Sequence, residues 1–154
     1  MGIEAIYDMS KMHPDDLNGV LVSENQMVGI VNNYPTRRTA VPFETVEIYT
    51  NNDRTLRVYV KTPELNVVNV AGAVGVLTIK ATKDSTIATI SKSTAVSGQG
   101  AIGSPDQGEM FFYILPADTV NIDVRQYVFD VKVTLSTGKV YTVLEGIINL
   151  QQTF

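Results

Sequence analysis

Apolar and polar residues alternate over two clear stretches of this chain. Over residues 55–61, Leu56, Val58 and Val60 fall on one face, and charged or aromatic residues fall on the other. Residues 127–135 repeat the pattern, with five apolar side chains at every second position: Tyr127, Phe129, Val131, Val133 and Leu135. A period of two is typical of a strand with one buried face. Both stretches therefore predict half-buried strands.

Shorter apolar runs, separated by turn signals, predict the remaining strands. Asn51-Asn52-Asp53 and the segment 136–139 have turn composition, residues 93–108 predict a long Ser/Gly/Pro loop, and Gly146 predicts a bulge. About seven or eight short strands at regular spacing, with almost no helical period, indicate an all-β sandwich. The further predicted strands span residues 45–50, 67–70, 76–81, 86–91 and 110–115, and the last one runs over 140–144 and, past the bulge, over 147–150.

The first 42 residues show no sustained period, although Val28 to Val31 suggests one short strand. They have apolar side chains but no pattern that would build a core, so we predict an extended arm over 1–42 and a sandwich domain over 43–154. We expect the arm to contact neighbouring proteins. The expected interface residues are Ile3, Ile6, Leu17, Val20, Leu21, Val22, Met27, Ile30, Arg37 and Arg38.

Composition and charge narrow the class of protein. The chain has 154 residues, 44% of them hydrophobic and 18% charged, which is typical of one globular domain. Its net charge of −4 lies mainly in residues 1–53, where three basic and eight acidic side chains give −5; this argues against a nucleic-acid partner. There is no cysteine, no apolar run long enough to cross a membrane and no basic leader at the start. We therefore expect no membrane partner and a product made in a cytoplasm.

Two motifs suggest chemistry, but their context does not support it. Residues 98–103 fit G-x-G-x-x-G, yet no helix pattern follows to hold a phosphate. His13 lies near Asp8, Asp15 and Asp16, in a segment without a predicted rigid element or a second histidine. We therefore expect no cofactor and no metal.

No catalytic constellation stands out either. The single histidine has no nucleophile with a positioning partner, and the six carboxylates considered for a glycosidase pair are Glu44, Glu47, Glu109, Asp118, Asp123 and Asp130, none of which is singled out. The chain has seven tyrosines and no tryptophan, so an aromatic sugar platform would have to use residues such as Tyr34, Tyr49 or Tyr59. The sequence predicts a protein that is not an enzyme and makes protein–protein contacts.

Several segments carry a family resemblance. The strand patterns at 55–60 and 127–134, the segments 70–73 and 108–119, and the end at 138–146 resemble the immunoglobulin-like module of tailed-phage virion proteins. The N-terminal domain of phage baseplate upper proteins is one example of that module. The resemblance covers residues 54–154, and residues 1–53 have no counterpart in it.

The resemblance implies an immunoglobulin-like sandwich and a role in the phage particle. The function it favours is an accessory structural protein, a capsid decoration or stabilisation protein attached through its arm. Its implied partners are other phage structural proteins such as the major capsid protein. The chain itself would be present in many copies in a large assembly. Its implied location is the virion, assembled in the host bacterial cytoplasm. A tail, neck or baseplate adaptor is the alternative, and a carbohydrate-binding β-sandwich module is the alternative from another class.

Overall fold

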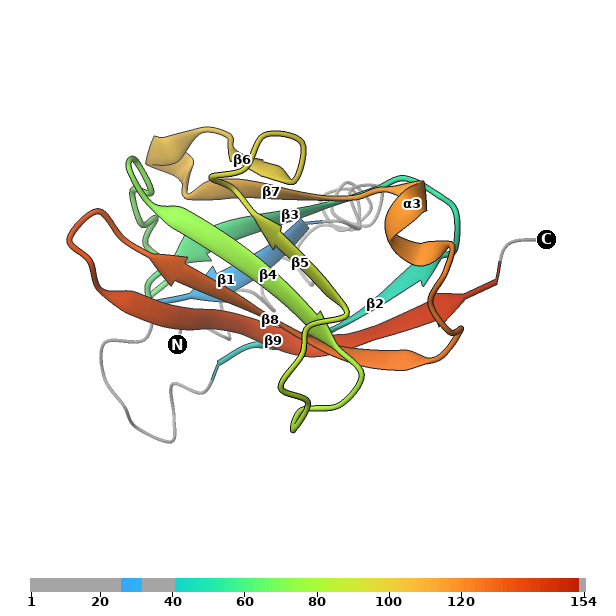
Figure 1. Cartoon of the computed structure of the whole chain (residues 1–154). Helices are drawn as coiled ribbons and strands as arrows, with labels where there is room; N and C mark the ends of the chain where they lie inside the picture. Colours follow the sequence, from blue (N-terminus) through green and yellow to red (C-terminus); the bar gives the residue numbers. More distant parts are fainter. Residues whose placement is uncertain (1–25, 32–40, 153–154) are drawn as a thin grey trace, which may run out of the picture.

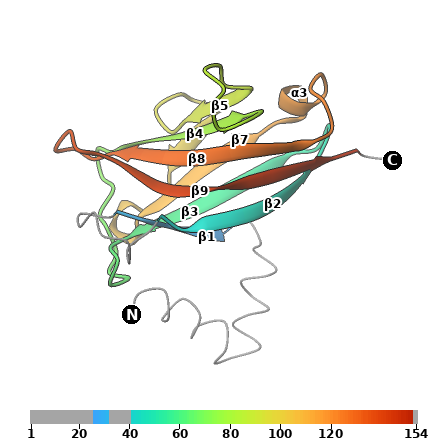
Figure 2. The ribbon, with the colours of Figure 1, turned by 90° about the horizontal axis from the view of Figure 1, so that it is seen from below.

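Two β-sheets pack face to face in the computed structural model, which describes residues 26–31 and 41–152. Figure 1 shows the two layers, with the short helix α3 (Pro116–Thr119) at one end. The edge strands β1 and β2 lie at one lateral side of the sandwich, and β6 and β5 lie at the other (Figures 1 and 2). The predicted all-β sandwich is confirmed.

The smaller sheet has four strands in the order β1-β3-β7-β6. Strand β1 runs parallel to β3, and the other neighbours are antiparallel. The strands are β1 (Gln26–Ile30), β3 (Arg54–Lys61), β7 (Glu109–Ile114) and β6 (Gly100–Ile102).

The larger sheet has five strands in the order β2-β9-β8-β4-β5. Strand β2 runs parallel to β9, which follows it in sequence by about a hundred residues, and the other neighbours are antiparallel. The strands are β2 (Phe43–Tyr49), β9 (Val140–Gln151), β8 (Gln126–Thr134), β4 (Val74–Lys80) and β5 (Ile90–Ser93).

The core lies between the sheets and follows the predicted alternation. Leu56, Val58 and Val60 of β3 are fully buried. Tyr127, Phe129, Val131 and Val133 of β8 are buried as well, so the predicted registers of both strands are confirmed. Burying such side chains contributes about 1.5–3 kcal/mol each, before the entropy of ordering is subtracted.

Three predicted segments differ from the observed structure. Residues 67–70 form no strand: Val67 makes one isolated bridge to Lys61, while Val70 is buried and donates its N–H to the Pro105 carbonyl. The strand expected over 86–91 begins only at Ile90. The loop expected over 93–108 contains strand β6 and a 3₁₀ turn, η2 (Pro105–Gln107). In each case the backbone pairs with other segments of the chain, and the local pattern of apolar residues does not predict such pairing.

Strand β9 has a bulge, but not at Gly146, where the sequence predicted it. The register between β8 and β9 shifts between Val131, opposite Leu144, and Lys132, opposite Thr142, so Val143 is the extra residue of the bulge. Gly146 has another role: a Cβ there would lie 2.6 Å from Cε1 of Phe129. The ring of Phe129 therefore crosses the adjacent strand at its one residue without a side chain.

The prediction of an arm that ends at residue 42 is wrong for β1. Met27 and Val31 belong to the core cluster, and Ile30 is only 5% exposed. A Cβ on Gly29 would lie 2.8 Å from Cγ2 of Val143, so β1 approaches β9 closely at this glycine. The first strand thus belongs to the sandwich, because parallel pairing with β3 buries its side chains.

Candidate interaction site

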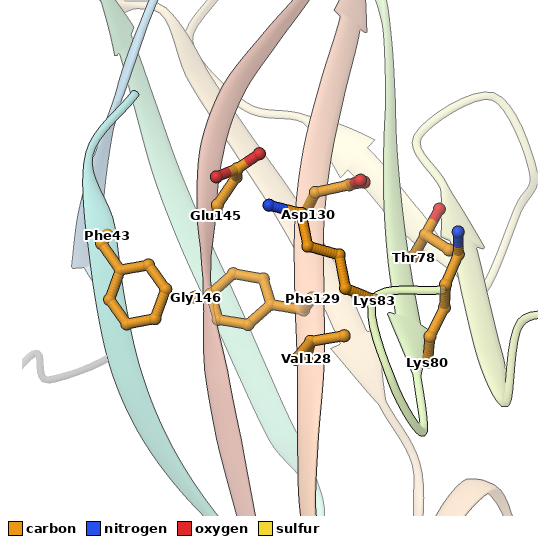
Figure 3. Close-up of a pocket in the computed structure, with 9 residues that line it drawn as sticks. All are labelled: Phe43, Thr78, Lys80, Lys83, Val128, Phe129, Asp130, Glu145 and Gly146. Carbon is orange, nitrogen blue, oxygen red and sulfur yellow. The ribbon is translucent and has the colours of Figure 1, made fainter. Parts of the chain in front are cut away.

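The outer face of the five-stranded sheet carries a shallow hollow. Alternation along β2, β8 and β9 turns Phe43, Asp130 and Glu145 away from the core. The hollow has a volume of about 90 Å³, below the roughly 300 Å³ at which small-molecule pockets begin. Its lining residues are Phe43, Thr78, Lys80, Lys83, Val128, Phe129, Asp130, Glu145 and Gly146 (Figure 3). The size suits a single side chain of a partner.

The exposed ring of Phe43 forms one side of this hollow, and the buried Phe129 lies beneath it in the core. Phe43 is 62% exposed at the start of β2. Gly146 leaves room for the ring of Phe129, and Figure 3 shows the two rings on either side of this glycine. An apolar contact surface, to which the outward-facing Val128 also contributes, is therefore present on this sheet face.

The charged side of the hollow holds two acidic and two basic groups. Asp130 and Glu145 face each other across β8 and β9, and like charges in that position destabilise a sheet. Burial raises the pKa of Asp130, the charges of Lys132 and Lys80 lower it, and Glu145 raises it. Lys80 and Lys83 line the same hollow, and Figure 3 shows Lys83 extending over β8 in the direction of Glu145. Within the described residues, the buried Oδ1 of Asp130 has no hydrogen-bond partner.

Beside this hollow, β2 forms the rim of the sheet. Its parallel pairing uses the peptide groups of the even-numbered residues: Glu145 donates to the Pro42 carbonyl and Thr50 donates to the Gln151 carbonyl. The peptide groups of Phe43, Thr45, Glu47 and Tyr49 therefore face away from β9. Tyr49 is 44% exposed, on the same face as Phe43. This rim combines outward-facing backbone groups with two exposed aromatic side chains.

Two side chains modify the rim. Nη1 of Arg54 donates to the Glu47 carbonyl at 2.8 Å, which covers one of its outward acceptors. Glu44 lies on the inner side of β2, and burial raises its pKa. Charged groups of this kind restrict indiscriminate strand pairing at sheet edges.

The outer face of the four-stranded sheet is held by contacts within the chain, although among the described residues the buried Nε of Arg57 makes no hydrogen bond. Oε2 of Glu109 lies 3.4 Å from Nε of Arg57 and accepts a hydrogen bond of 3.0 Å from the Tyr59 hydroxyl. The guanidinium of Arg57 also lies over the ring of Phe111, 5.0 Å from its centroid. Burial, followed by this bond to Glu109, raises the pKa of Tyr59. Ion pairs and ring contacts within the chain occupy these groups.

The structure places only some of the predicted interface residues. Met27 lies in the core and Ile30 is buried, so the prediction that these two contact a partner is wrong. The other eight predicted interface residues, and the His13 cluster, lie outside the described residues. Those interface residues are Ile3, Ile6, Leu17, Val20, Leu21, Val22, Arg37 and Arg38.

Other sequence features have structural roles. The glycine motif at 98–103 spans a turn and strand β6, where Gly103 lies against Glu109 and Phe111. Among the predicted carboxylates, Asp118 binds Nζ of the buried Lys92 at 2.7 Å. Sequence reasoning missed Phe43, although the alternation of β2 extends back to it, and it missed Glu145, whose partner depends on the register of β8 and β9.

The described ranges, 26–31 and 41–152, contain no group of three His, Cys, Asp or Glu side chains arranged to hold a metal ion. Within the same ranges, no helix has the length and apolarity needed to cross a membrane.

Comparisons with known proteins give distant similarities in fold only. No protein-family model matches the chain, and no curated protein matches it. The N-terminal domain of phage TP901-1 ORF48 is similar with a TM-score of 0.47 and 8% identity, over 82% of this chain and 98% of that one. CopC from Methylosinus trichosporium OB3b gives 0.39 and 11%, over 71% and 86% of the two chains. The sandwich assignment therefore rests on the strand pairing described above.

Proposed function

We propose that this chain is an accessory structural protein of a tailed-bacteriophage particle and works by protein–protein contact. The observation that carries the proposal is the position of the resembling segments. Four of the five segments fall in β3, β7, β8 and β9, which are four of the five inner strands of the two sheets, and the segment 70–73 forms the turn before β4. The resemblance therefore concerns the framework of the fold.

The exposed surface supports contact with other proteins. Phe43 and Tyr49 stand on one face of one strand. Three more exposed apolar side chains flank helix α3: Leu115 before it, and Val120 and Val124 after it. Aromatic side chains are enriched at protein interfaces.

Within the particle, we favour decoration or stabilisation of the capsid, with the major capsid protein as partner. A tail, neck or baseplate adaptor is the second position. Since β1 belongs to the sandwich, the proposed attachment element is residues 1–25 and no longer extends to residue 42. It contains the apolar residues Ile3, Ile6, Leu17, Val20, Leu21 and Val22.

Reconstitution tests this function. Particles that lack the component are mixed with the full-length chain, and co-sedimentation and electron microscopy then measure its incorporation and position. A full-length variant with Leu17→Ser, Val20→Ser and Leu21→Ser should remain folded but not join the particle, while Lys132→Ala should join normally. Failure of the unaltered chain to join any part of the particle would contradict the virion role. Normal incorporation of the triple variant would instead exclude only residues 1–25 as the attachment element.

The hollow beside Phe43 favours one function of another class, glycan binding. An exposed aromatic ring next to carboxylates and lysines offers both stacking and hydrogen bonding to a sugar. Glycan-array binding that is lost in Phe43→Ala and kept in Tyr49→Ala would support this candidate.

A further inference from the structure

Strand β2 offers a rim of seven residues to which the described part of the chain adds no second neighbour. We propose that this rim pairs antiparallel with β2 of a second copy of the chain, with the two-fold axis at Val46. The pairing would join two five-stranded sheets edge to edge. This inference goes beyond the proposed function and does not depend on it.

The backbone geometry of β2 suits such pairing. The peptide groups of residues 43, 45, 47 and 49 face away from β9, as its hydrogen bonds to Pro42 and from Thr50 require. In an antiparallel pair centred on Val46, residues 45 and 47 of opposite copies exchange hydrogen bonds, and so do residues 43 and 49. The Glu47 carbonyl would accept from Thr45 of the second copy in place of Arg54. Every outward peptide group of β2 would then have a backbone partner.

The side chains select this register. Phe43 and Tyr49 lie three residues on either side of Val46, on the same exposed face. The axis at Val46 therefore places Phe43 of each copy directly opposite Tyr49 of the other. Cross-strand aromatic pairs of this kind stabilise sheets. The pairing would cover the two most exposed side chains among the large apolar residues of β2.

The charges agree with the same register. Glu47 would lie opposite Thr45, and Glu44 opposite Ile48, so no carboxylate meets another directly. An axis at Glu47 would bring the two Glu47 side chains opposite each other, which destabilises a sheet. An axis at Thr45 would place Tyr49 opposite Val41 and lose the aromatic pairs.

Most devices that block strand edges are missing from β2. Residues 43–49 contain no proline and no lysine, and their pairing with β9 shows no bulge. The devices present are the inward-facing Glu44, which would lie opposite Ile48 in this register, and the Arg54 bond to Glu47, which a backbone amide can replace. The rim is therefore suited to one specific partner strand.

The first test measures self-association of the full chain by sedimentation velocity over a concentration series. The unaltered chain should form a reversible dimer. Thr45→Pro removes an outward N–H and leaves the bonds to β9 intact, so it should raise the dimer dissociation constant at least about tenfold, because each dimer loses two hydrogen bonds. Thr45→Val keeps the N–H and should dimerise as the unaltered chain does. A monomer at all concentrations, or a Thr45→Pro dimer of unchanged strength with an intact circular-dichroism spectrum, would overturn the proposal.

The second test checks the register, and it is simple because the chain has no cysteine. Val46 would face its own copy in a non-hydrogen-bonded pair, about 4.5 Å between Cα atoms, which is within the range for a disulfide. Val46→Cys should therefore form a disulfide-linked dimer on mild oxidation. Thr45→Cys should not, because its two copies would be separated by an offset of two residues along the strands. Equal cross-linking of both variants, or none of Val46→Cys, would contradict the register.

Discussion

Strands β1 and β2 both come from the first third of the chain, and both run parallel to an inner strand, yet their surroundings differ. Strand β1 has buried side chains on both faces, with Met27 and Val31 in the core and Ile30 turned the opposite way. Strand β2 buries Val46 and Ile48 but exposes Phe43 and Tyr49. Both are edge strands, but β1 has buried side chains on its two faces and β2 keeps one face exposed. Parallel pairing with an inner strand therefore does not show by itself how fully a strand is buried in the domain.

The largest difference in stability is expected when the same carboxylate is placed in β1 and, separately, in β2. Met27→Asp should destabilise the protein by about 4 kcal/mol or more, because an unpaired charge would enter the core. Thr45→Asp, on the exposed face of β2, should change the free energy of unfolding by less than about 0.5 kcal/mol. Urea denaturation of both variants measures the difference. Similar midpoints would mean that β1 is not part of the core.

The next largest effect concerns Phe129, the buried aromatic residue of β8 whose ring lies across Gly146 of β9. Phe129→Ala should cost about 3–5 kcal/mol, since it removes a buried ring that lies across Gly146. Lys132→Ala on the outer face of the same strand should cost less than about 0.5 kcal/mol. Equal shifts of the denaturation midpoint would show that the register of β8 is reversed.

A smaller loss of stability, caused by a change at Gly146, should affect β2 and not β1. Gly146→Ala would push a methyl group against the Phe129 ring and the Glu44 carbonyl, at an expected cost of about 1–3 kcal/mol. Hydrogen exchange should then speed up at the β2 amides that face β9 and stay slow in β1. Asn149→Ala, on the outer face of β9, is the matched control and should leave both strands protected. Faster exchange in β1 as well would mean that the two strands open together.

The smallest effect lies on the open face and depends on pH. Burial raises the pKa of Asp130 in the folded state above its unfolded value, so the native protein holds this proton more tightly. The associated stability is fully present below the unfolded pKa, about 3.9, and is lost as pH rises through the higher folded pKa. Asp130→Asn should therefore be more stable than the unaltered chain at pH 7, by less than about 1 kcal/mol, and the gain should vanish near pH 4. A variant that is less stable at pH 7 would show that the attraction of Lys80 and Lys132 outweighs burial.

Sequence periodicity was sufficient where a strand buries one face. The registers of β3 and β8 follow directly from alternation, and β7 follows from its apolar run. It was insufficient for β1, which is five residues long, contains a glycine and buries both faces, so it has no contrast between sides. The bulge at Val143 has the same effect in β9, because it places two buried residues in succession.

The candidate site depends on information that no local pattern carries. Phe43 could have been found by extending the alternation of β2 back by two residues. The pair Asp130 and Glu145 could not, because its members meet only when the bulge sets the register of β8 and β9. The outward direction of the β2 peptide groups likewise depends on its parallel pairing with a strand from the other end of the chain.

That last pairing has a consequence for how the protein is made. Phe43 pairs with Glu145 and Tyr49 with Gln151, so β2 waits for a strand synthesised 102 residues later in each case. At translation rates of about 5–20 residues per second, this delay lasts roughly 5–20 s. Throughout that interval β2 lacks its hydrogen-bonding partner, whereas β1 pairs with β3, which starts 24 residues after β1 ends. The nascent chain is therefore expected to be most vulnerable to premature association and to chaperone capture through residues 43–49, until β9 has left the ribosome.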